Sequence, residues 1–431
     1  MEERISPLRG FFALSPLIVF LLLYLALSLL VGDFYAMPIT VAFLLSCLYA
    51  LVVLRGRPVA ERFEVLTEGA SSSSLMMMIW IFILAGAFAS TAKGMGAIDA
   101  TVNLTLALMP EKLILPGLFL ASCFVSLSVG TSVGTIAALT PIAAGVAQQT
   151  GLSLPMIVAI VVGGAYFGDN LSFISDTTIM ATRTQGCELR DKFRMNLRIA
   201  MPAAIITMIL YAFIGYEQNA AAATGEIDYV RVLPYLFVLI AAIAGMNVML
   251  VLTLGTLMAL CMGLGLGAFD VMGGMKAMGE GIMGMSELII VTLMAGGLIG
   301  VIRQAGGIDF LLQQLTRRIS GRRGAECSIA ALVTLTDLCT ANNTIAILTV
   351  GPLAKEISTH YGVDPRRSAC LLDTFSCFAQ GLIPYGAQML IACGLASVNP
   401  LQIIPHLYYP FILGIIATIY IFIHHEQEKV H

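Results

Sequence analysis

The sequence predicts an all-α polytopic membrane protein in which two inverted-topology repeats carry broken helices and re-entrant hairpins. Two observations place the chain in a lipid bilayer. Hydrophobic residues make up 58% of the 431 residues and charged residues only 11%, so there are too few polar side chains to cover a water-soluble domain of this size. Apolar runs long enough to span a hydrocarbon core of about 30 Å recur along the whole chain. A third observation, an internal duplication, predicts the two repeats.

The apolar runs provide about fourteen candidate segments, some too short to cross a bilayer alone, so we expect about 11 to 14 membrane segments. In chain order they lie near residues 11–32, 35–54, 75–92, 113–129, 131–149, 153–168, 195–216, 231–246, 248–266, 286–303, 324–339, 340–358, 367–380 and 402–424. The opening run lacks a short apolar region followed by a small-residue cleavage site, so we expect it to be retained as a first span.

The duplication relates two stretches that lie about 210 residues apart. Residues 84–99 are LAGAFASTAKGMGAID, and residues 294–309 are MAGGLIGVIRQAGGID. Both have Ala-Gly at the second and third positions, a basic residue at the tenth (Lys93 and Arg303) and Gly-x-Ile-Asp at the end. In so hydrophobic a chain, a duplication predicts a transporter made of two related halves, with its site where the halves meet.

The duplication also predicts how the chain is divided. We expect a first transporter repeat at residues 10–185, a linker span at 195–216, a second, inverted repeat at 230–400 and an extra C-terminal span at 402–424.

Clusters of Arg and Lys predict the orientation in the membrane. They lie at residues 4–9, 55–62, 183–198, 317–323 and 366–367, whereas the loop at 217–228 carries acids and no base. Because basic loops tend to stay in the cytoplasm, placing all five clusters there is self-consistent and puts both termini on that side of the cell inner (plasma) membrane. The first repeat then begins inside and the second begins outside, which makes the repeats inverted.

Four polar, glycine-rich interruptions fall within the apolar runs, two in each half. The first pair is 130–135 (GTSVGT) and 340–344 (TANNT), and the second is 163–178 (GGAYFGDNLSFISDTT) and 378–388 (FAQGLIPYGAQ). Hydrocarbon penalises unpaired backbone groups, so such interruptions occur where backbone lines a cavity or an ion site. We expect broken helices at the first pair and re-entrant hairpins at the second.

The interruptions carry the oxygen ligands that suit a dehydrated Na⁺, namely carboxylate, amide, hydroxyl and backbone carbonyl groups. The alternative for the Ser, Thr and Asn side chains is hydrogen bonding to a neighbouring helix, which is common in membrane bundles. Asp169 and Asp176 lie in a hydroxyl-rich stretch flanked by apolar segments, and a carboxyl group at membrane depth is a functional candidate by default. Asp337 and Asp373 are further candidates, for which an interfacial position is the alternative.

Two of these motifs resemble the NhaC-type Na⁺/H⁺ antiporter family of the ion transporter superfamily. The run at 130–135 is followed about thirty residues later by FGDNLSFISDTT at 167–178, in the order that the family shows. The second motif is quite specific, whereas the first alone is weak. Phe173 departs from the family, which typically has Pro after the residue matching Ser172, and so removes a helix breaker. The resemblance implies a secondary transporter with inverted repeats, whose paired hairpins and broken helices hold the cation.

Carried over residue by residue, the resemblance points to a site for Na⁺ or substrate. The matching residues are Asp169, Asn170, Ser172, Ser175, Asp176, Thr177 and Thr178, with Thr131 and Ser132 on the facing broken helix. From the opposite repeat, we expect Asn342, Asn343 and Thr344 to close the site. We expect Asp176 to be the carboxylate that H⁺ and Na⁺ share and Asp169 to be a second ligand or an orienting group. Asp337 and Asp373 complete the proton-coupling candidates.

The expected function is secondary active transport that exchanges Na⁺ (or Li⁺) for H⁺ across the cytoplasmic membrane by alternating access. Loss of water favours the protonated form of a buried carboxyl group, and an entering Na⁺ displaces that proton. A site occupied by either ion crosses between inward- and outward-facing states, whereas an empty, charged site crosses poorly, so antiport follows. The expected partners are membrane lipid and the transported cations, and we expect no cofactor.

The alternative is a Na⁺- or H⁺-coupled carrier or exchanger of a small carboxylate, of the malate/lactate type, or of an amino acid. The resemblance leaves the substrate open, because the family includes members described as exchanging malate for lactate and others linked to amino acids. Helix N-termini at Ser132 and Asn343 could hold a substrate carboxylate. Arg303 or Lys93 would support this alternative if it reached the cavity.

Other functional classes are disfavoured. An intramembrane aspartyl protease needs two carboxylates that share a proton, but the duplication pairs Asp169 with Gln380 or its neighbours and Asp337 with Leu127, so we expect no enzyme. No ring of repeated charges or carbonyl filter indicates a channel. The nine Cys and five His lack metal-ligand spacing, and no basic cluster suggests nucleic acid. A homodimer is compatible with this architecture, although no residue identifies an interface.

Overall fold

The computed structural model describes residues 6–23, 38–108, 110–173, 175–217, 228–244, 246–316 and 319–423. Within these ranges all regular structure is helical and no strand occurs. Several residues used to predict the orientation lie outside the described residues, namely Arg4, Arg317, Arg318, both chain ends (1–5 and 424–431) and most of the acidic loop (218–227).

The helices fall into two series of matching order, one in each half of the chain. The first series is α1 (Pro7–Leu21), α3 (Ile39–Val53), α4 (Val59–Ala70), α5 (Ser73–Gly94), α6 (Ala97–Leu108), the 3-10 turn η2 (Glu111–Leu113), α7 (Ile114–Val129), α8 (Ser132–Thr150), α9 (Leu154–Leu171), α10 (Asp176–Gln185) and α11 (Leu189–Glu217). The second series is α12 (Tyr229–Ile243), α13 (Val248–Gly265), α14 (Val271–Gly284), α15 (Ser286–Gln304), α16 (Gly307–Thr316), α17 (Gly321–Thr340), α18 (Asn343–Tyr361), α19 (Pro365–Leu382), α20 (Ala387–Ala396), α21 (Pro400–Ile403), the 3-10 turn η3 (Ile404–His406) and α22 (Tyr408–Ile423). Each helix from α3 to α10 has a counterpart ten labels later.

Many of these helices can cross a membrane. Seven segments of the described chain are long and apolar enough to do so, and an eighth results if Pro400–His406 and Tyr408–Ile423, bent by 53° at their junction, form one span. Four shorter apolar helices accompany them. The prediction of an all-α, polytopic membrane protein is therefore confirmed. The residue boundaries predicted for the repeats stay a prediction.

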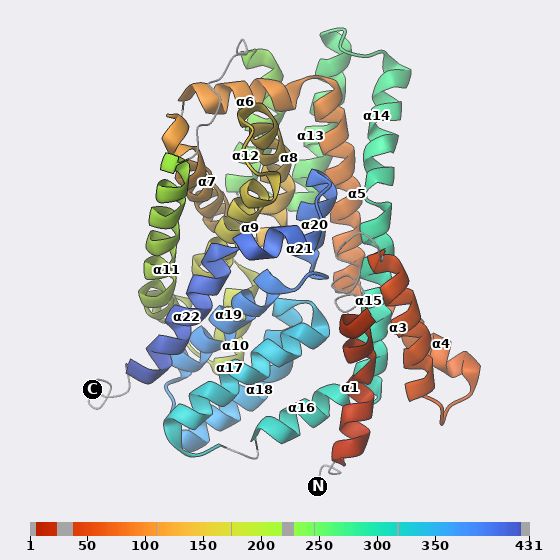
Figure 1. Cartoon of the computed structure of the whole chain (residues 1–431), viewed down its shortest axis with the longest axis vertical. Coiled ribbons are helices and arrows are strands. Elements are labelled where there is room, and N and C mark those ends of the chain that lie inside the picture. The colour runs from red at the N-terminus through yellow and green to blue at the C-terminus, as the bar shows by residue number, and fades with distance from the viewer. Residues whose placement is uncertain are drawn as a thin grey trace.

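Helices of the two series pack against each other. A contact between a helix of the first series and a helix of the second recurs between their two counterparts. Helix α4 packs against α15, and its counterpart α14 packs against α5. Likewise α10 packs against α18, and α20 packs against α8. The hairpin of α13 and α14 lies at the top of Figure 1, whereas α3 and α4 lie at the lower right. Opposite positions of corresponding elements are what inverted repeats require.

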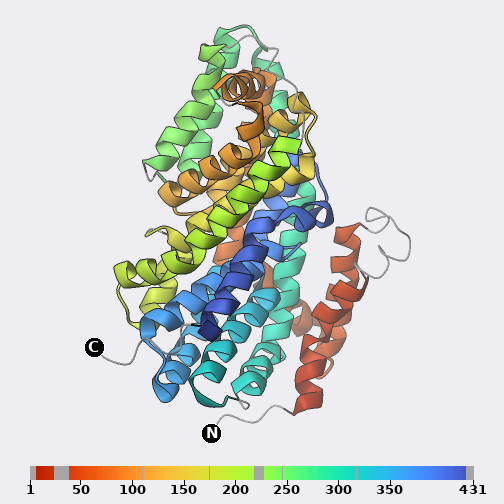
Figure 2. The same cartoon turned by 60° about the vertical axis from the view of Figure 1, so that its left-hand side comes forward.

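The first described helix begins and the last one ends in the lower part of the molecule, as Figures 1 and 2 both show. Helix α1 rises from that end, and α22 runs down to it. The two ends of the described chain therefore lie on one side of the bundle.

Both halves contain the predicted interruptions. Helices α7 and α8 are separated at Gly130 (φ 71°), and α17 and α18 at Ala341 (φ 49°), where the left-handed backbone ends one helix and lets the next begin. Helices α9 and α10 instead continue as one interrupted span, Leu154–Gln185, and α19 and α20 as another, Pro365–Ala396. The stretch around Phe173 is thus a break within a span and not a tight hairpin.

Glycines allow the closest contacts between the halves. A Cβ on Gly69 of α4 would lie 2.5 Å from the carbonyl oxygen of Gly296 on α15. In the counterpart contact, a Cβ on Gly281 of α14 would overlap the carbonyl oxygen of Gly86 on α5 and lie 2.6 Å from Cβ of Ser90. Small residues at such crossings let membrane helices approach closely.

We expect Gly281→Ala to lower the thermal stability of the purified protein in detergent, because overpacking a tight contact costs about 1–3 kcal/mol. Gly279→Ala is the matched control, since a Cβ there meets no atom within 4 Å and Ala favours a helix. The measurement is the unfolding temperature of both variants. Equal unfolding temperatures would contradict a tight contact between α14 and α5.

Candidate functional site

A buried carboxylate faces the start of a broken helix in the first half. Asp169, near the C-terminal end of α9, is only 4% exposed. Its Oδ1 accepts a hydrogen bond from the backbone N–H of Ser132, the first residue of α8, at 3.0 Å. The start of a helix carries a partial positive charge. The α8 N-terminus therefore stabilises a negative charge on Asp169.

Hydroxyl groups of the predicted set surround the break between α9 and α10. The hydroxyls of Thr177 and Thr178 donate to the backbone carbonyl of Asp169 at 3.2 and 3.3 Å. Ser175 lies 2.9 Å from Thr177, oxygen to oxygen. Ser172 donates to the carbonyl of Leu127 at the end of α7. These bonds satisfy backbone groups that the break leaves open and hold the first turn of α10 against α9.

A chain of amide side chains joins the two halves at their breaks. Nε2 of Gln388, on α20, donates to the hydroxyl of Ser132 at 3.1 Å. Gln380, on α19, donates to Oε1 of Gln388 at 2.9 Å and to the carbonyl of Ala341 at 3.0 Å. This amide chain (Ala341, Gln380, Gln388, Ser132) connects the break of one half to the break of the other.

A second buried charge centre lies next to Asp169. Nζ of Lys192, on α11, pairs with Oδ2 of Asp373, on α19, at 2.5 Å, and both side chains are fully buried. Lys192 also donates to the carbonyl of Asn170 at 2.8 Å and to the hydroxyl of Thr178 at 2.7 Å. The ion pair therefore connects the second half to the residue that follows Asp169.

Asn196 completes this charge centre. Its amide donates to Oδ2 of Asp373 and to the carbonyl of Asn170, both at 2.8 Å. Its Oδ1 accepts from the hydroxyl of Thr374 at 2.9 Å. Asp373 is thus buried within the bundle between α11 and α19, and its depth in the membrane stays a prediction.

Sequence reasoning missed Lys192, Asn196, Gln380 and Gln388 as site residues. Lys192 was assigned to a cytoplasmic basic cluster, but the structure buries it on the side of α11 where Asp373 of α19 offers a partner. The spacing of Lys192 and Asn196, one helical turn apart, is a pattern that could have indicated a shared polar face. Gln380 and Gln388 lie within a predicted interruption without having been singled out.

Asp337 is a third buried carboxyl group, one turn before the break at Ala341. It is fully buried within the protein, and its depth in the membrane stays a prediction. Neither of its carboxyl oxygens has a hydrogen-bond partner among the described residues. A buried, unpaired carboxylate is costly, so this group requires a proton or a cation as its partner.

The remaining predicted residues are placed less centrally. Asp176 is exposed at the start of α10. Asn342 accepts from the backbone N–H of Ile345, and Asn343 accepts from that of Thr344, so both asparagine oxygens cap α18. Thr131 and Thr344 are half-buried. The structure thus favours Asp169 over Asp176 as the central carboxylate, because only Asp169 combines burial with a donor at a helix N-terminus.

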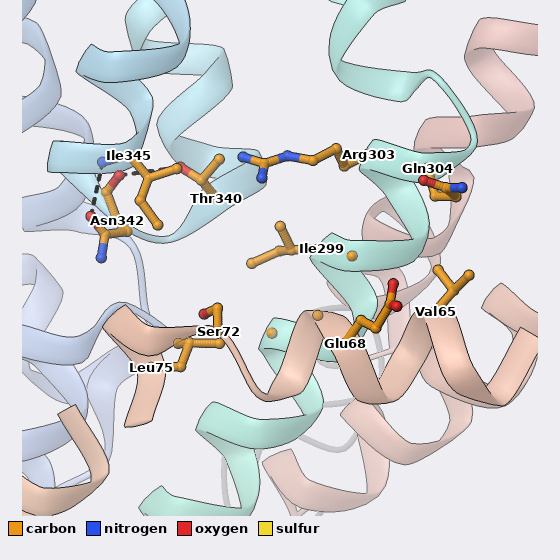
Figure 3. Close-up of a pocket in the computed structure, with 13 residues that line it drawn as sticks. Val65, Glu68, Ser72, Leu75, Ile299, Arg303, Gln304, Thr340, Asn342 and Ile345 are labelled. Atoms are coloured by element: carbon orange, nitrogen blue, oxygen red, sulfur yellow. Dashed lines mark hydrogen bonds between the residues drawn. The ribbon is translucent and has the colours of Figure 1, made fainter. Parts of the chain in front are cut away.

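A pocket of about 260 Å³ opens beside the second break. Figure 3 shows Arg303 extending toward Thr340, with Asn342 and Ile299 nearby, whereas Glu68 lines the pocket from α4 with its carboxylate on the side of Val65. A smaller cavity of about 20 Å³ shares Thr340 and Ile299 with it and reaches Ala341 and Tyr385. The pocket therefore leads to one end of the amide chain.

We expect the buried ion pair to be strongly coupled. Lys192→Met or Asp373→Leu alone leaves one charge buried without its partner, which costs about 3–5 kcal/mol of stability, whereas the double variant recovers most of it. Thermal unfolding of the four proteins measures the coupling. The exposed pair Lys276 and Glu280, 3.8 Å apart, is the matched control, with an expected coupling below about 1 kcal/mol. Additive effects of the two buried substitutions would contradict the pairing.

The sequence matches a known protein family along almost its whole length. The model of the Na⁺/H⁺ antiporter family matches residues 8–216 and 220–424. The two matched segments coincide with the series α1 to α11 and α12 to α22.

Three characterised proteins illustrate the range of relatives. The Na⁺/H⁺ antiporter NhaC of Alkalihalophilus pseudofirmus is 25% identical over 78% of this chain and 79% of its own length. The malate-2H⁺/Na⁺-lactate antiporter of Bacillus subtilis is 19% identical over 94% of both chains. The arginine/ornithine antiporter ArcD of Halobacterium salinarum is 22% identical over 84% of this chain and 81% of its own.

Proposed function

Because this chain belongs to the Na⁺/H⁺ antiporter family, we propose that it exchanges Na⁺ (or Li⁺) for H⁺ by alternating access in the cell inner (plasma) membrane. It acts as a secondary active transporter, not as an enzyme, and needs no cofactor. The observation that carries the proposal is the buried carboxylate of Asp169 at the N-terminus of α8, beside a second buried charge centre at Lys192 and Asp373.

The cation site is centred on Asp169 and includes oxygens from the break after α9. Oδ1 of the neighbouring Asn170 is buried and has no hydrogen-bond partner among the described residues. The hydroxyls of Thr177 and Thr178 lie against the Asp169 backbone. Carboxylate, amide and hydroxyl oxygens are the hard ligands that suit Na⁺. We therefore assign the shared carboxylate to Asp169 in place of Asp176.

Coupling follows from the charge of this site. With neither cation nor proton, Asp169 presents a net negative charge that the protein must carry through the apolar region between the halves, which is unfavourable. Occupation by Na⁺ or by H⁺ removes that charge. Only the two occupied forms then cross, so inward movement of one ion is tied to outward movement of the other.

The fold supports alternating access. Because α4 and α15 repeat the contact of α14 and α5 with the halves exchanged, the two halves can exchange conformations and turn a state open on one side into a state open on the other. Asp337, whose carboxyl oxygens have no hydrogen-bond partner among the described residues, is a second candidate carrier of protons.

We expect Asp169→Asn to reduce Na⁺-dependent proton movement at least tenfold, because the amide cannot take up a proton or balance a cation. The assay is fluorescence dequenching across a pH gradient in proteoliposomes, with Na⁺, Li⁺ and K⁺ added in turn. Asp176→Asn is the matched control and should retain exchange. The opposite pattern, with exchange lost only in Asp176→Asn, would move the site to the exposed carboxylate.

The second candidate function is a Na⁺- or H⁺-coupled carrier of a small carboxylate or amino acid. The observation that favours it is Arg303, which lines the pocket beside the second break. Two of the relatives have names that include organic solutes. Ion movement in the same assay only when such a solute is present would establish this function over exchange of inorganic cations alone.

A further inference from the structure

The ammonium group of Lys192 is surrounded by oxygens in the way that a bound metal cation is. Its Nζ lies 2.5 Å from Oδ2 of Asp373, 2.7 Å from the hydroxyl oxygen of Thr178 and 2.8 Å from the carbonyl oxygen of Asn170. An ammonium group has three N–H donors, and each of them has one of these acceptors. Carboxylate, hydroxyl and carbonyl oxygens are also the ligands that suit a hard cation. The ammonium group therefore occupies a position at which the protein offers the ligands of a small cation.

Asn196 holds two of these oxygens in place independently of Lys192. Its amide group donates to Oδ2 of Asp373 and to the carbonyl of Asn170, both at 2.8 Å. Its own Oδ1 accepts a hydrogen bond from the hydroxyl of Thr374 at 2.9 Å, and the whole residue is buried. Hydrogen bonds from outside a cation site orient its ligands in this way. The two oxygens thus keep these hydrogen bonds when the ammonium group is removed.

One oxygen of the Asp373 carboxylate has no hydrogen-bond partner. Oδ1 is buried and forms no hydrogen bond with any described residue, while Oδ2 accepts from both Lys192 and Asn196. A buried ion pair is most stable when hydrogen bonds satisfy the remaining oxygens as well. A metal cation can be bound by both oxygens of one carboxylate. Oδ1 is therefore available as a further ligand if a metal ion replaces the ammonium group.

The ion pair and the cation site at Asp169 are connected by one hydroxyl group. The hydroxyl of Thr178 accepts from Lys192 and donates to the backbone carbonyl of Asp169. Two buried carboxylates, those of Asp169 and Asp373, are thus joined to this break, and the protein itself supplies a cation to only one of them. The charge balance leaves room for one exchangeable ion, although oxygen ligands are present for two.

We propose that Lys192 occupies a second Na⁺ site with its own ammonium group and thereby limits the protein to one Na⁺ at this break. The inference rests on the proposed exchange of Na⁺ at Asp169 and adds a residue that sets the number of ions bound. Because the ammonium group is attached to α11, it neutralises Asp373 without leaving the protein. Its removal opens a site made of the Asp373 carboxylate, the Asn170 carbonyl and the Thr178 hydroxyl.

The test is equilibrium binding of radioactive Na⁺ to the full chain purified in detergent, with choline chloride to keep the ionic strength constant. Lys192→Ala should bind one more Na⁺ per chain than the unaltered protein, because it removes the ammonium group and leaves space for the ion. In the Asp169→Asn background, which lacks the first site, Lys192→Ala should raise the Na⁺ affinity at least tenfold. Adding Asp373→Asn should abolish that gain, because the amide carries no charge to balance the ion.

Two control variants separate the site from the mere loss of a positive charge. Lys192→Met also removes the charge, but its side chain fills the space, so it should bind no additional Na⁺. Lys276→Ala removes a lysine from the exposed pair with Glu280, whose charged atoms lie 3.8 Å apart, and should leave the number of bound Na⁺ unchanged.

Thermal unfolding provides a second measurement in case Lys192→Ala is unstable at low salt. NaCl should raise the unfolding temperature of Lys192→Ala more than that of the unaltered protein, because an ion that binds only the folded state stabilises it. Choline chloride should not have this effect. A variant that stays unfolded even in high NaCl would contradict the inference, since Na⁺ would then fail to replace the ammonium group.

The inference is overturned if Lys192→Ala binds no more Na⁺ than its parent, or if the gain survives Asp373→Asn. Unchanged Na⁺ binding in Asp169→Asn alone would instead defeat the cation site of the proposed function. The effect of Lys192→Ala is measured with and without Asp169→Asn, so the failure of one site can be distinguished from the failure of the other.

Discussion

The ion pair between Lys192 and Asp373 is the contact on which the polar centre of this protein depends. It joins α11 of the first half to α19 of the second, and the same ammonium group donates to the Asn170 carbonyl and the Thr178 hydroxyl. An interrupted helix in an apolar region leaves backbone carbonyls without partners, and hydrocarbon supplies none. Lys192 satisfies one of them at the break after Asp169, while Asp373 balances its charge. Without this pair, the break beside Asp169 would lose the hydrogen bonds that Lys192 donates there.

The breaks at Gly130 and Ala341 form the second constraint. Each ends one helix in a left-handed conformation and exposes the N-terminus of the next, but the two N-termini have different partners. The start of α8 faces the Asp169 carboxylate, whereas the start of α18 is capped by its own asparagines. The halves are therefore alike in architecture and unlike in chemistry. This difference accounts for a single carboxylate-centred site in a protein whose helices occur in two matching series.

Three carboxyl groups have surroundings in the structure that the sequence alone did not reveal. Asp169 and Asp176 lie in one hydroxyl-rich motif and look equivalent in the sequence, yet only Asp169 is buried, because the break between α9 and α10 turns Asp176 outward. Asp373 lies on α19, and its ion pair depends on a partner about 180 residues earlier in the chain, which the sequence around it does not indicate. Lys192 was assigned to a basic loop by the rule that basic loops stay in the cytoplasm. That rule counts Lys and Arg residues along the chain and takes no account of charges that a neighbouring helix buries.

The sequence by itself determined that the protein lies in a lipid bilayer, that it is helical, that it contains a duplication and where its helices break. These properties depend on local composition, on periodicity and on the penalty for unpaired backbone in hydrocarbon, all of which can be evaluated along one segment. Only the tertiary structure decided which polar groups meet, such as Asp169 with Ser132 and Asp373 with Lys192. Each of these partners comes from a different helix, and most from distant parts of the chain. Their pairing depends on how the two halves pack against each other. This packing cannot be evaluated from any single segment of the sequence.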